Sequence, residues 1–326
     1  MSPRQLPHIV TLIVLSVFAA RHSGAQPPVY PVKPVRLLVG FVPGGGTDIT
    51  ARAVGQKLSE RIGQPVVVDN RPGAGGLVAR DIVRNAAPDG YSLLLLTSSQ
   101  VVNASLIQKD PVDVRRAFAH ISLLVWYPYL LVSNPSLPVK TVSEMIAYAK
   151  SRPGALNYGT PGIGTAAHLG TELLKHMAGI DMVHVPYKGS GAVVIDLMGG
   201  QIQVAFASAI SSVPHVNSGK LRALAVSSGR RSKTLPNIPT VAESGVPGYD
   251  ATGWYSMAAP AQTPRSIVMK LNQEIAAVLE TPEVQKSLVA DGAEPEHSTP
   301  EQLDRKMREE VEKWTRLLAT SGIKLQ

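Results

Sequence analysis

The sequence predicts an α/β protein built on parallel sheets, and two observations favour this class. Short apolar runs without a polar break recur along the chain, and the clearest are Val35–Phe41 and Leu93–Thr97. Amphipathic segments with helical spacing separate these runs. Uninterrupted apolar strands that alternate with helices are typical of a parallel sheet covered on both faces. The 326 residues are enough for two domains of this kind.

In the first part of the chain, each expected strand leads through a turn into a helix. The strand Val35–Phe41 is followed by a helix that Thr47 is expected to cap and Gly63 to end. Val66–Asp69 is the next strand, and a glycine-rich turn then introduces a helix over Leu77–Ala86. Leu93–Thr97 completes this part as a strand.

The second part repeats the order of strand, glycine turn and helix. Thr141 and Glu144 form a capping box for one helix, and Thr165 caps another that Gly179 ends. The strands of this part are expected at Leu130–Val132, Leu156–Tyr158, Val183–Val185, Val204–Ala207 and Leu221–Ser227. The architecture is therefore expected to be duplicated.

From Thr263 onward the sequence predicts helices. Thr263-Pro264, Thr281-Pro282 and Thr299-Pro300 each place a threonine cap before a proline at the first helical position. We expect these helices to return and cover the first part of the chain.

This return requires the chain to cross twice between the two parts. The crossings are expected near Leu124–Pro128 and Gly248–Trp254, where they would form a two-strand hinge. The predicted domains are therefore 26–126 together with 250–326, and 127–249.

The N-terminus has the features of a secretory signal peptide that ends at Ala25. Arg4 supplies positive charge, and Ile9–Ala20 is apolar but shorter than the roughly 20 residues of a membrane-spanning helix. Ser23-Gly24-Ala25 fits the small-x-small cleavage pattern. An uncleaved N-terminal anchor is the alternative. We expect residues 1–25 to be removed, and the mature chain not to be inserted in a membrane.

Composition excludes several functional classes. The chain has no cysteine, which rules out disulfides, thiolate metal sites and a cysteine nucleophile. The formal charge of +8 is scattered and forms no basic stripe with interleaved aromatics, so nucleic acid is not an expected partner. The eight histidines show no metal-ligand spacing, and no nucleotide-binding or hydrolase motif is complete. We therefore expect no cofactor, no metal and no catalytic residue.

Two glycine-rich turns are the most informative motifs. The sequence reads FVPGGGTD over residues 41–48 and YGTPGIGT over residues 158–165. Each turn follows a predicted strand and opens a helix, whose N-terminus offers unpaired N–H groups and the positive end of the helix dipole. Because the turns lie in different predicted domains, we expect them to hold an anionic ligand between them.

The expected ligand contacts lie at these turns and at neighbouring strand ends, where open α/β sheets bind ligands. They are Gly45, Gly46, Thr47, Asp48, Ser98, Ser99, Gly162, Gly164, Thr165, His168 and Tyr187. For Asp48, simple complementation of the helix dipole is an equal alternative. For His168, a structural hydrogen bond is the favoured alternative.

Several longer motifs follow one another along the predicted mature chain. The sequence reads VDNRPGAGG at 68–76, APDGY at 87–91, VPYKG at 185–189, GKLRALAV at 219–226 and PTVAE at 239–243. In this order, and together with the two glycine turns, they resemble the Bug family. The members of that family are the extracytoplasmic solute receptors of tripartite tricarboxylate transporters.

The resemblance implies a type II periplasmic binding protein fold, in which two doubly wound domains close like a Venus flytrap. It also implies a periplasmic receptor that captures a small organic carboxylate with backbone groups of the glycine turns. The receptor would deliver this acid to a membrane permease made of a large and a small subunit. We expect it to be a monomer.

One position departs from the family pattern. The family commonly carries an aspartate after the strand Val204-Ala205-Phe206, where this chain has Ala207. If that aspartate holds a polar or cationic group, the present chain is expected to prefer a ligand that lacks one. Ala207 is therefore counted among the candidate ligand-binding positions.

Two other functions remain open from the sequence. An accessory protein of a signalling receptor would use the same ligand-bound state. A secreted hydrolase would use Pro43–Gly46 as an oxyanion hole, but it would need a nucleophile and a base that no motif supplies.

Overall fold

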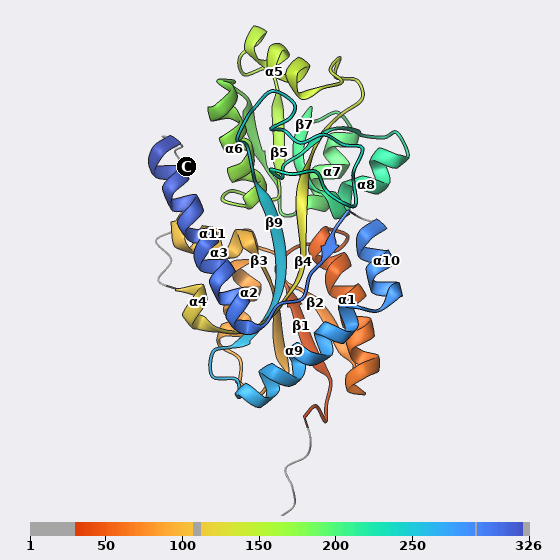
Figure 1. The fold of residues 1–326 in the computed structure, drawn as a ribbon, viewed down its shortest axis with the longest axis vertical. Helices are drawn as coiled ribbons and strands as arrows, with labels where there is room; N and C mark the ends of the chain where they lie inside the picture. The colour runs from red at the N-terminus through yellow and green to blue at the C-terminus, as the bar shows by residue number, and fades with distance from the viewer. Residues whose placement is uncertain (1–29, 107–111, 291, 322–326) are drawn as a thin grey trace, which may run out of the picture. The chain divides into compact units, whose positions relative to one another are not determined.

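The computed structural model describes residues 30–106, 112–290 and 292–321, and Figure 1 shows their fold. The predicted signal peptide lies outside the described residues. Among the helices of the described part, none combines the length and the apolar character that crossing a membrane requires.

Ten described strands form one mixed sheet, which divides into two halves along β4 (Phe118–Ser133). Half-sheet 1 contains residues 118–128 of β4 with β1 (Val35–Val39), β2 (Val66–Asn70), β3 (Ser92–Thr97), β9 (Thr252–Pro260) and β10 (Glu294–Pro295). Half-sheet 2 contains residues 129–133 of β4 with β5 (Asn157–Thr160), β6 (Val183–Pro186), β7 (Val204–Ser208) and β8 (Arg222–Val226).

The predicted parallel sheet is correct for the outer strands of each half. β1, β2 and β3 run parallel to one another, and so do β5, β6 and β7. β4 and β9 differ, because each runs antiparallel to its neighbours. Leu93, Leu94 and Leu96 of β3 are fully buried, as expected for a strand covered on both faces.

The two predicted crossing segments pair with each other. In β4 and β9, Trp126 lies opposite Trp254, Tyr127 opposite Gly253 and Pro128 opposite Thr252. Figure 1 shows the two strands side by side through the middle of the fold. β4 is much longer than the predicted Leu130–Val132. The prediction was too short because polar residues and a proline interrupt the apolar pattern in the first part of the strand.

The described residues from Pro31 to Ser321 form one compact unit. The two half-sheets meet between Pro128 and Tyr129 of β4, and the division of the chain into two domains at residues 126 and 250 stays a prediction. The same holds for hinge motion about β4 and β9.

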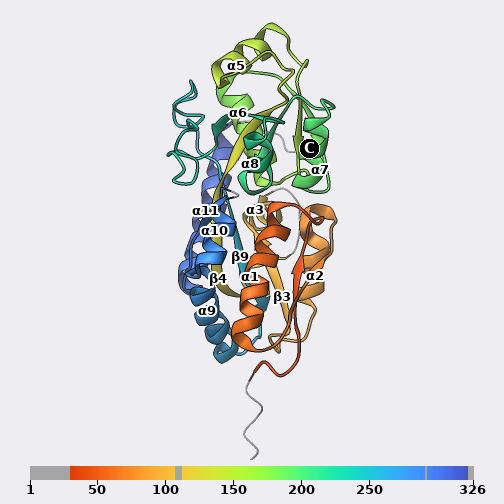
Figure 2. The ribbon, with the colours of Figure 1, turned by 90° about the vertical axis from the view of Figure 1, so that its right-hand side faces the viewer.

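Helices precede and follow the strands of both half-sheets. They are α1 (Gly46–Ile62), η1 (Ala74–Gly76), α2 (Leu77–Arg84), α3 (Ser98–Leu106), α4 (Val114–Ala117), α5 (Val142–Ser151), α6 (Ala166–Ala178), α7 (Ser190–Met198), α8 (Ala209–Asn217), α9 (Arg265–Leu279), α10 (Pro282–Ala290) and α11 (Pro300–Ser321). Figure 2 shows α5 to α8 around half-sheet 2, with α1 and α2 beside half-sheet 1.

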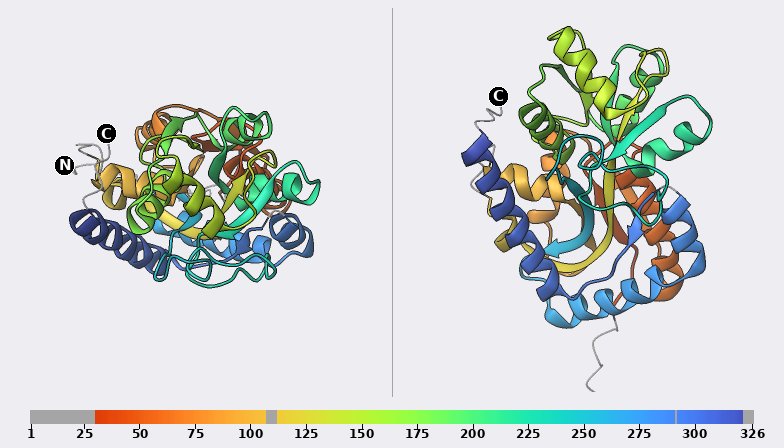
Figure 3. Two further views of the ribbon diagram at one scale, coloured as in Figure 1. Left: turned by 90° about the horizontal axis from the view of Figure 1, so that it is seen from above. Right: turned by 45° about the horizontal axis from the view of Figure 1, so that its top comes forward.

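The C-terminal helices return to half-sheet 1, as predicted. α9 and α10 pack beside α1, and α11 packs against α3 and β4. Leu303 and Met307 of α11 are fully buried in one apolar cluster with Trp254 of β9. Figure 3 shows these helices, in blue, along half-sheet 1. The packing of α11 therefore helps to hold the crossing strand β9 in place.

The predicted helix caps are partly correct. Thr165 accepts a hydrogen bond from the His168 N–H, and Thr299 forms its capping box with Gln302. Two caps are wrong, because the N-cap residue is Gly45 rather than Thr47 in α1, and Pro264 rather than Thr263 in α9. The Thr263 hydroxyl instead donates to the Pro260 carbonyl, which closes the preceding turn. Gly63 and Gly179 end their helices in the left-handed conformation, as expected.

A substitution at Gly253 tests how tightly the two crossing strands pack. A Cβ at this position would lie 2.6 Å from two ring carbons of buried Tyr127. We expect Gly253→Ala to lower the free energy of unfolding by about 1–3 kcal/mol, because the ring has to move. Chemical denaturation measures this change.

Gly55→Ala is the matched control, since its Cβ would meet only ordinary contacts in α1, the nearest at 3.4 Å. It should leave stability unchanged or raise it by up to about 1 kcal/mol. Equal stabilities of Gly253→Ala and the parent protein would contradict the packing described here.

Candidate functional site

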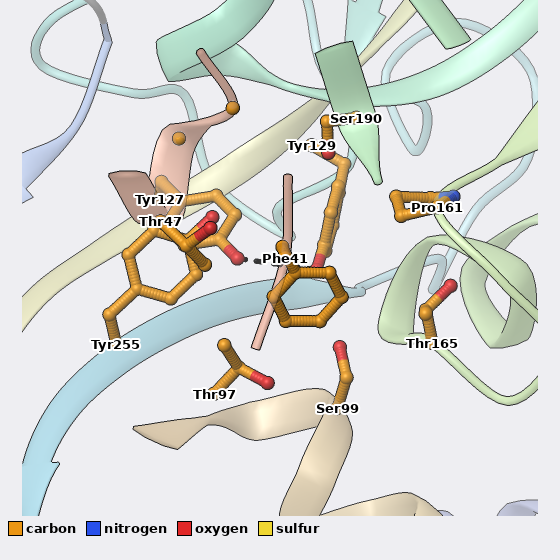
Figure 4. A pocket seen from close by; sticks show the side chains of 12 residues that line it. Phe41, Thr47, Thr97, Ser99, Tyr127, Tyr129, Pro161, Thr165, Ser190 and Tyr255 are labelled. Atoms are coloured by element: carbon orange, nitrogen blue, oxygen red, sulfur yellow. Dashed lines mark hydrogen bonds between the residues drawn. The ribbon is translucent and has the colours of Figure 1, made fainter. Parts of the chain in front are cut away.

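A pocket lies at the carboxyl ends of the parallel strands of both half-sheets. Its empty space, including the open mouth, is about 400 Å³. The lining residues are Phe41, Gly45, Gly46, Thr47, Thr97, Ser99, Tyr127, Tyr129, Pro161, Thr165, Ser190 and Tyr255. Figure 4 shows their side chains, with the Thr97 and Ser99 hydroxyls below the ring of Phe41. Among the described residues that line this pocket, none is acidic or basic.

Four helices begin at this pocket, because a helix starts where the preceding parallel strand ends. α1 follows β1, α3 follows β3, α6 follows β5, and α7 follows β6. Each contributes a lining residue from its first turn or its N-cap, namely Thr47, Ser99, Thr165 and Ser190. Helix N-termini carry partial positive charge, so the pocket has an environment that favours an anion.

Two of these helices, α1 and α7, begin without a side-chain cap. Their N-cap residues are Gly45 and Gly189, neither of which has a side chain that accepts from the helix N–H groups. Gly46 and Thr47 of α1 and Ser190 of α7 line the pocket. The first N–H groups of both helices therefore offer donors for a ligand. The predicted contacts Gly45, Gly46 and Thr47 all lie at this pocket.

Asp48 is placed behind the first glycine turn and does not line the pocket. Its Oδ2 accepts the Gly44 N–H at 3.1 Å, and its Oδ1 lies 2.9 Å from Arg52 Nη2. Burial raises the pKa of Asp48, but hydrogen bonds from Arg52 and the Gly44 N–H outweigh this, and the net pKa is lowered. A charged Asp48 therefore holds the turn, and direct ligand contact by Asp48 stays a prediction.

The second glycine turn is held in the same way. The Gly164 N–H donates to Nδ1 of His168 at 3.0 Å, four residues further along, as Gly44 does to Asp48. The Thr165 hydroxyl donates to the Gly162 carbonyl at 2.8 Å. Of the four predicted residues of this turn, Thr165 lines the pocket, whereas Gly162, Gly164 and His168 do not.

A stack of rings supports this turn from behind. The His168 and His184 rings stack with centroids 4.2 Å apart, and Tyr158 stacks on His184 at 4.9 Å. His184 Nε2 lies 2.6 Å from the Thr160 hydroxyl, at the start of the turn. Glu172 accepts hydrogen bonds from Tyr158 and from the neighbouring lysine of α6. The two histidines therefore hold residues of the second turn, and neither lines the pocket.

The predicted serines at the start of α3 have separate roles. Ser98 is buried, and its hydroxyl accepts the Trp254 N–H at 3.4 Å. Ser99 lines the pocket, and its hydroxyl accepts the Ala166 N–H of α6 at 3.0 Å. This hydrogen bond links an element of half-sheet 1 to an element of half-sheet 2 across the pocket.

Two predicted contacts lie elsewhere. The Tyr187 hydroxyl donates to Asp196 at 2.8 Å, and its ring lines a neighbouring cavity with Gly162 and Lys188. Ala207 is buried in the apolar core of half-sheet 2 beside Leu130. Contact of either residue with a ligand, and any effect of Ala207 on ligand choice, stay predictions.

Sequence reasoning missed the aromatic wall of the pocket. Phe41, Tyr127, Tyr129 and Tyr255 supply four of its lining side chains. Tyr127 and Tyr129 are two residues apart in β4, so they face the same side of the strand. That spacing was the available signal, but it is informative only when the segment is recognised as a strand. Pro161 and Ser190 were also missed.

The wall tyrosines are neutral hydrogen-bonding groups. Burial raises the pKa of Tyr129 to about 12 and also raises the pKa values of Tyr127 and Tyr255. The Tyr127 and Tyr129 hydroxyl oxygens lie 3.4 Å apart. Near neutral pH, the tyrosines of the wall are therefore uncharged.

A family profile described as "Tripartite tricarboxylate transporter family receptor" matches residues 50–323. The chain belongs to this family. It is similar to Protein BugT of Bordetella pertussis, with 37% identity over 320 residues that cover 97% of this chain and 98% of BugT. Because the family is one of receptors, the chain is a receptor and not an enzyme, which closes the hydrolase alternative.

Two solved structures from Rhodopseudomonas palustris share the fold of this receptor. Rpa4515 with adipate is 36% identical with a TM-score of 0.87, and the match covers 90% of this chain and 99% of that chain. MatC with bound malate is 31% identical with a TM-score of 0.83, covering 87% and 98%. The structure of the periplasmic binding protein BugD is 33% identical with a TM-score of 0.86, covering 91% of this chain and 100% of that chain, so the predicted periplasmic binding protein fold is confirmed.

The ring stack behind the second turn makes stability depend on pH. Burial lowers the pKa of His184 from 6.5 to about 4 and also lowers the pKa of His168. As the pH falls below about 6.5, the unfolded chain binds protons that the native state does not. We therefore expect the free energy of unfolding to decrease from about pH 6.5 down to about pH 4.

His184→Phe keeps a stacking ring and removes one titrating group. It should reduce this slope by up to about 1.4 kcal/mol per pH unit. Denaturation curves across this pH range measure the slope. Identical slopes in the parent and the variant would contradict a role for His184 in this pH dependence.

Proposed function

We propose that this receptor binds a small organic carboxylate in the pocket between the two half-sheets. The observation that carries the proposal is the meeting of two helix N-termini without side-chain caps, those of α1 and α7, at one pocket. Their N–H groups supply hydrogen bonds to an anion, and the helix dipoles add to the attraction. The adipate and malate of the related structures are carboxylates, which supports the same ligand class here.

Neutral hydroxyl groups complete the anchor. Thr47, Thr97, Ser99 and Ser190 bring hydroxyls to the pocket, and no Lys or Arg side chain lines it. A carboxylate would then be held by backbone N–H and hydroxyl donors, which are fixed in place by the helices. Hydrogen bonds to a charged group contribute about 1.5–3 kcal/mol each, so each donor of the anchor has a measurable effect on affinity.

Ligand capture would couple to closure of the two halves. The donors come from both half-sheets, so a ligand reaches all of them only when the halves are together. In this proposal the domains are 26–126 with 250–326, and 127–249, and they rotate about the paired strands β4 and β9. The hydrogen bond from the Ala166 N–H to Ser99 would close with them.

The receptor would act outside the cytoplasmic membrane. A signal peptide over residues 1–25 would direct the chain to the periplasm, and the mature chain would deliver its ligand to the large and small membrane subunits of a tripartite transporter. The family description supports a transporter receptor, and the closed, ligand-bound form is the state that such subunits would recognise.

A ligand screen tests the anion anchor. The mature protein, residues 26–326, should first be unfolded and refolded to remove any carried-over ligand. A carboxylic acid at about 100 times its Kd should raise the free energy of unfolding by roughly 2.7 kcal/mol, while its amide should have little effect. Thermal shift measures both. Equal shifts from acid and amide would contradict the proposal.

One N–H donor can be removed without breaking its helix. Gly46 is the first residue of α1, where proline is tolerated, and Gly45 before it has the extended conformation that precedes proline. Gly46→Pro should weaken binding of the acid roughly ten- to hundredfold, because a charged hydrogen bond is lost. Isothermal titration calorimetry measures the affinity.

Gly46→Ala is the matched control, since it adds bulk but keeps the N–H. It should bind the acid more tightly than Gly46→Pro. If both variants lose affinity equally, bulk rather than the missing donor is responsible, and the role given to the Gly46 N–H is wrong.

A further inference from the structure

The aromatic wall indicates which chemical group accompanies the carboxylate of the ligand. This inference rests on the proposed carboxylate capture. Tyr127 is the centre of the wall, with ring centroids 4.6 Å from Tyr255 and 5.4 Å from Tyr129. These are the spacings at which aromatic rings attract one another beyond their burial of apolar area. Phe41 approaches from the turn after β1, and Figure 4 shows its ring between the tyrosines and Thr165.

The wall and the anchor come from different elements. The tyrosines are supplied by β4 and β9, whereas the N–H and hydroxyl donors come from the end of β3 and the starts of α1, α3, α6 and α7. A ligand that satisfies both has a carboxylate and a body suited to ring faces. A flat aromatic ring makes ring-to-ring contacts that a saturated chain or ring of the same size cannot make.

The absence of charged side chains among the described lining residues further restricts the class of ligand. The pocket has no acidic side chain to pair with an ammonium group, so an amino acid would leave its cation without a partner. It also has no basic side chain to pair with a second carboxylate among the rings. A single negative charge therefore suits the pocket better than two, and a zwitterion suits it less well still.

We propose that the ligand is an aromatic monocarboxylate, whose carboxylate is held at the helix N-termini and whose ring packs among Phe41, Tyr127, Tyr129 and Tyr255.

Four probes test this assignment on refolded mature protein by calorimetry. Benzoate and cyclohexanecarboxylate have the same charge and ring size, and differ in aromaticity. We expect benzoate to bind about tenfold more tightly than cyclohexanecarboxylate. Adipate, with two charges and no ring, should bind more weakly than benzoate. Benzamide, which lacks the charge, should bind least.

The outcomes separate the two proposals. Equal or tighter binding of cyclohexanecarboxylate or adipate would overturn the aromatic assignment and leave carboxylate capture standing. Benzamide binding as tightly as benzoate would overturn carboxylate capture itself. Failure of benzoate to bind a well-folded sample would also overturn the aromatic assignment.

Substitutions in the aromatic wall test whether its rings cause the expected preference for benzoate. Phe41→Leu removes a ring from a turn, and we expect it to weaken benzoate about fivefold while changing cyclohexanecarboxylate less than twofold. Tyr129→Leu should act in the same direction, and Tyr129→Phe, which keeps the ring, should bind benzoate nearly as well as the parent. Tyr148→Leu in α5, away from the pocket, is the control and should change neither affinity. Equal losses for both ligands in Phe41→Leu and Tyr129→Leu would overturn the assignment.

Discussion

The antiparallel pairing of β4 with β9 is the constraint on which the rest of the structure depends. Successive residues of a strand face opposite sides, so neighbouring residues of β9 serve different purposes. Trp254 faces the core and packs with Leu303 and Met307 of α11, whereas Tyr255 faces the pocket. The same two strands therefore join the half-sheets, anchor the C-terminal helix and build one wall of the site.

The two glycine turns reach equivalent geometry with different chemistry. In each, a side chain in the first turn of the helix accepts an N–H from four residues earlier, in the turn itself. The acceptor is a carboxylate in one case, Asp48, and an imidazole in the other, His168. Both side chains lie behind the backbone rather than in the pocket. What the turns share is thus a backbone N–H held by a side chain behind the pocket, and the chemistry of that side chain is free to differ.

Much of the fold follows from local pattern, and much of the site does not. The strands, the ends of α1 and α6 and the crossing segments were predictable, because buried strands are uniformly apolar and left-handed caps require glycine. The length of β4 was not, since His120 and Pro128 interrupt its pattern, and pairing with β9 and β10 keeps its first part extended. The caps Thr47 and Thr263 failed because a threonine near a helix start also serves inside the first turn or in the turn before it.

The residues of the candidate site were also predictable only in part. Gly45, Gly46 and Thr47 were predictable from their turn, as was Thr165, because a glycine turn before a helix has a recognisable local signal. Phe41 and Tyr255 were not, because they come together through the pairing of β1 with β3 and of β3 with β9, which local sequence does not reveal. Asp48 and His168 are polar residues in the first turn of a helix at the site. Their sequence positions do not reveal whether they support the loop or contact a ligand, whereas the structure shows that both accept a hydrogen bond from the loop.

An anchor made of backbone N–H groups has a consequence for how such a receptor can change over generations. Every residue except proline carries an N–H, so almost no single codon change can delete the anchor, and side-chain mutations near it leave the donor in place. The aromatic wall has no such protection, because a change in one codon can replace Phe41 by leucine and so remove a ring. Affinity for a carboxylate is thereby insulated from mutation while the choice among carboxylates is exposed to it. A lineage with this architecture can explore new nutrients without first losing the ability to bind one.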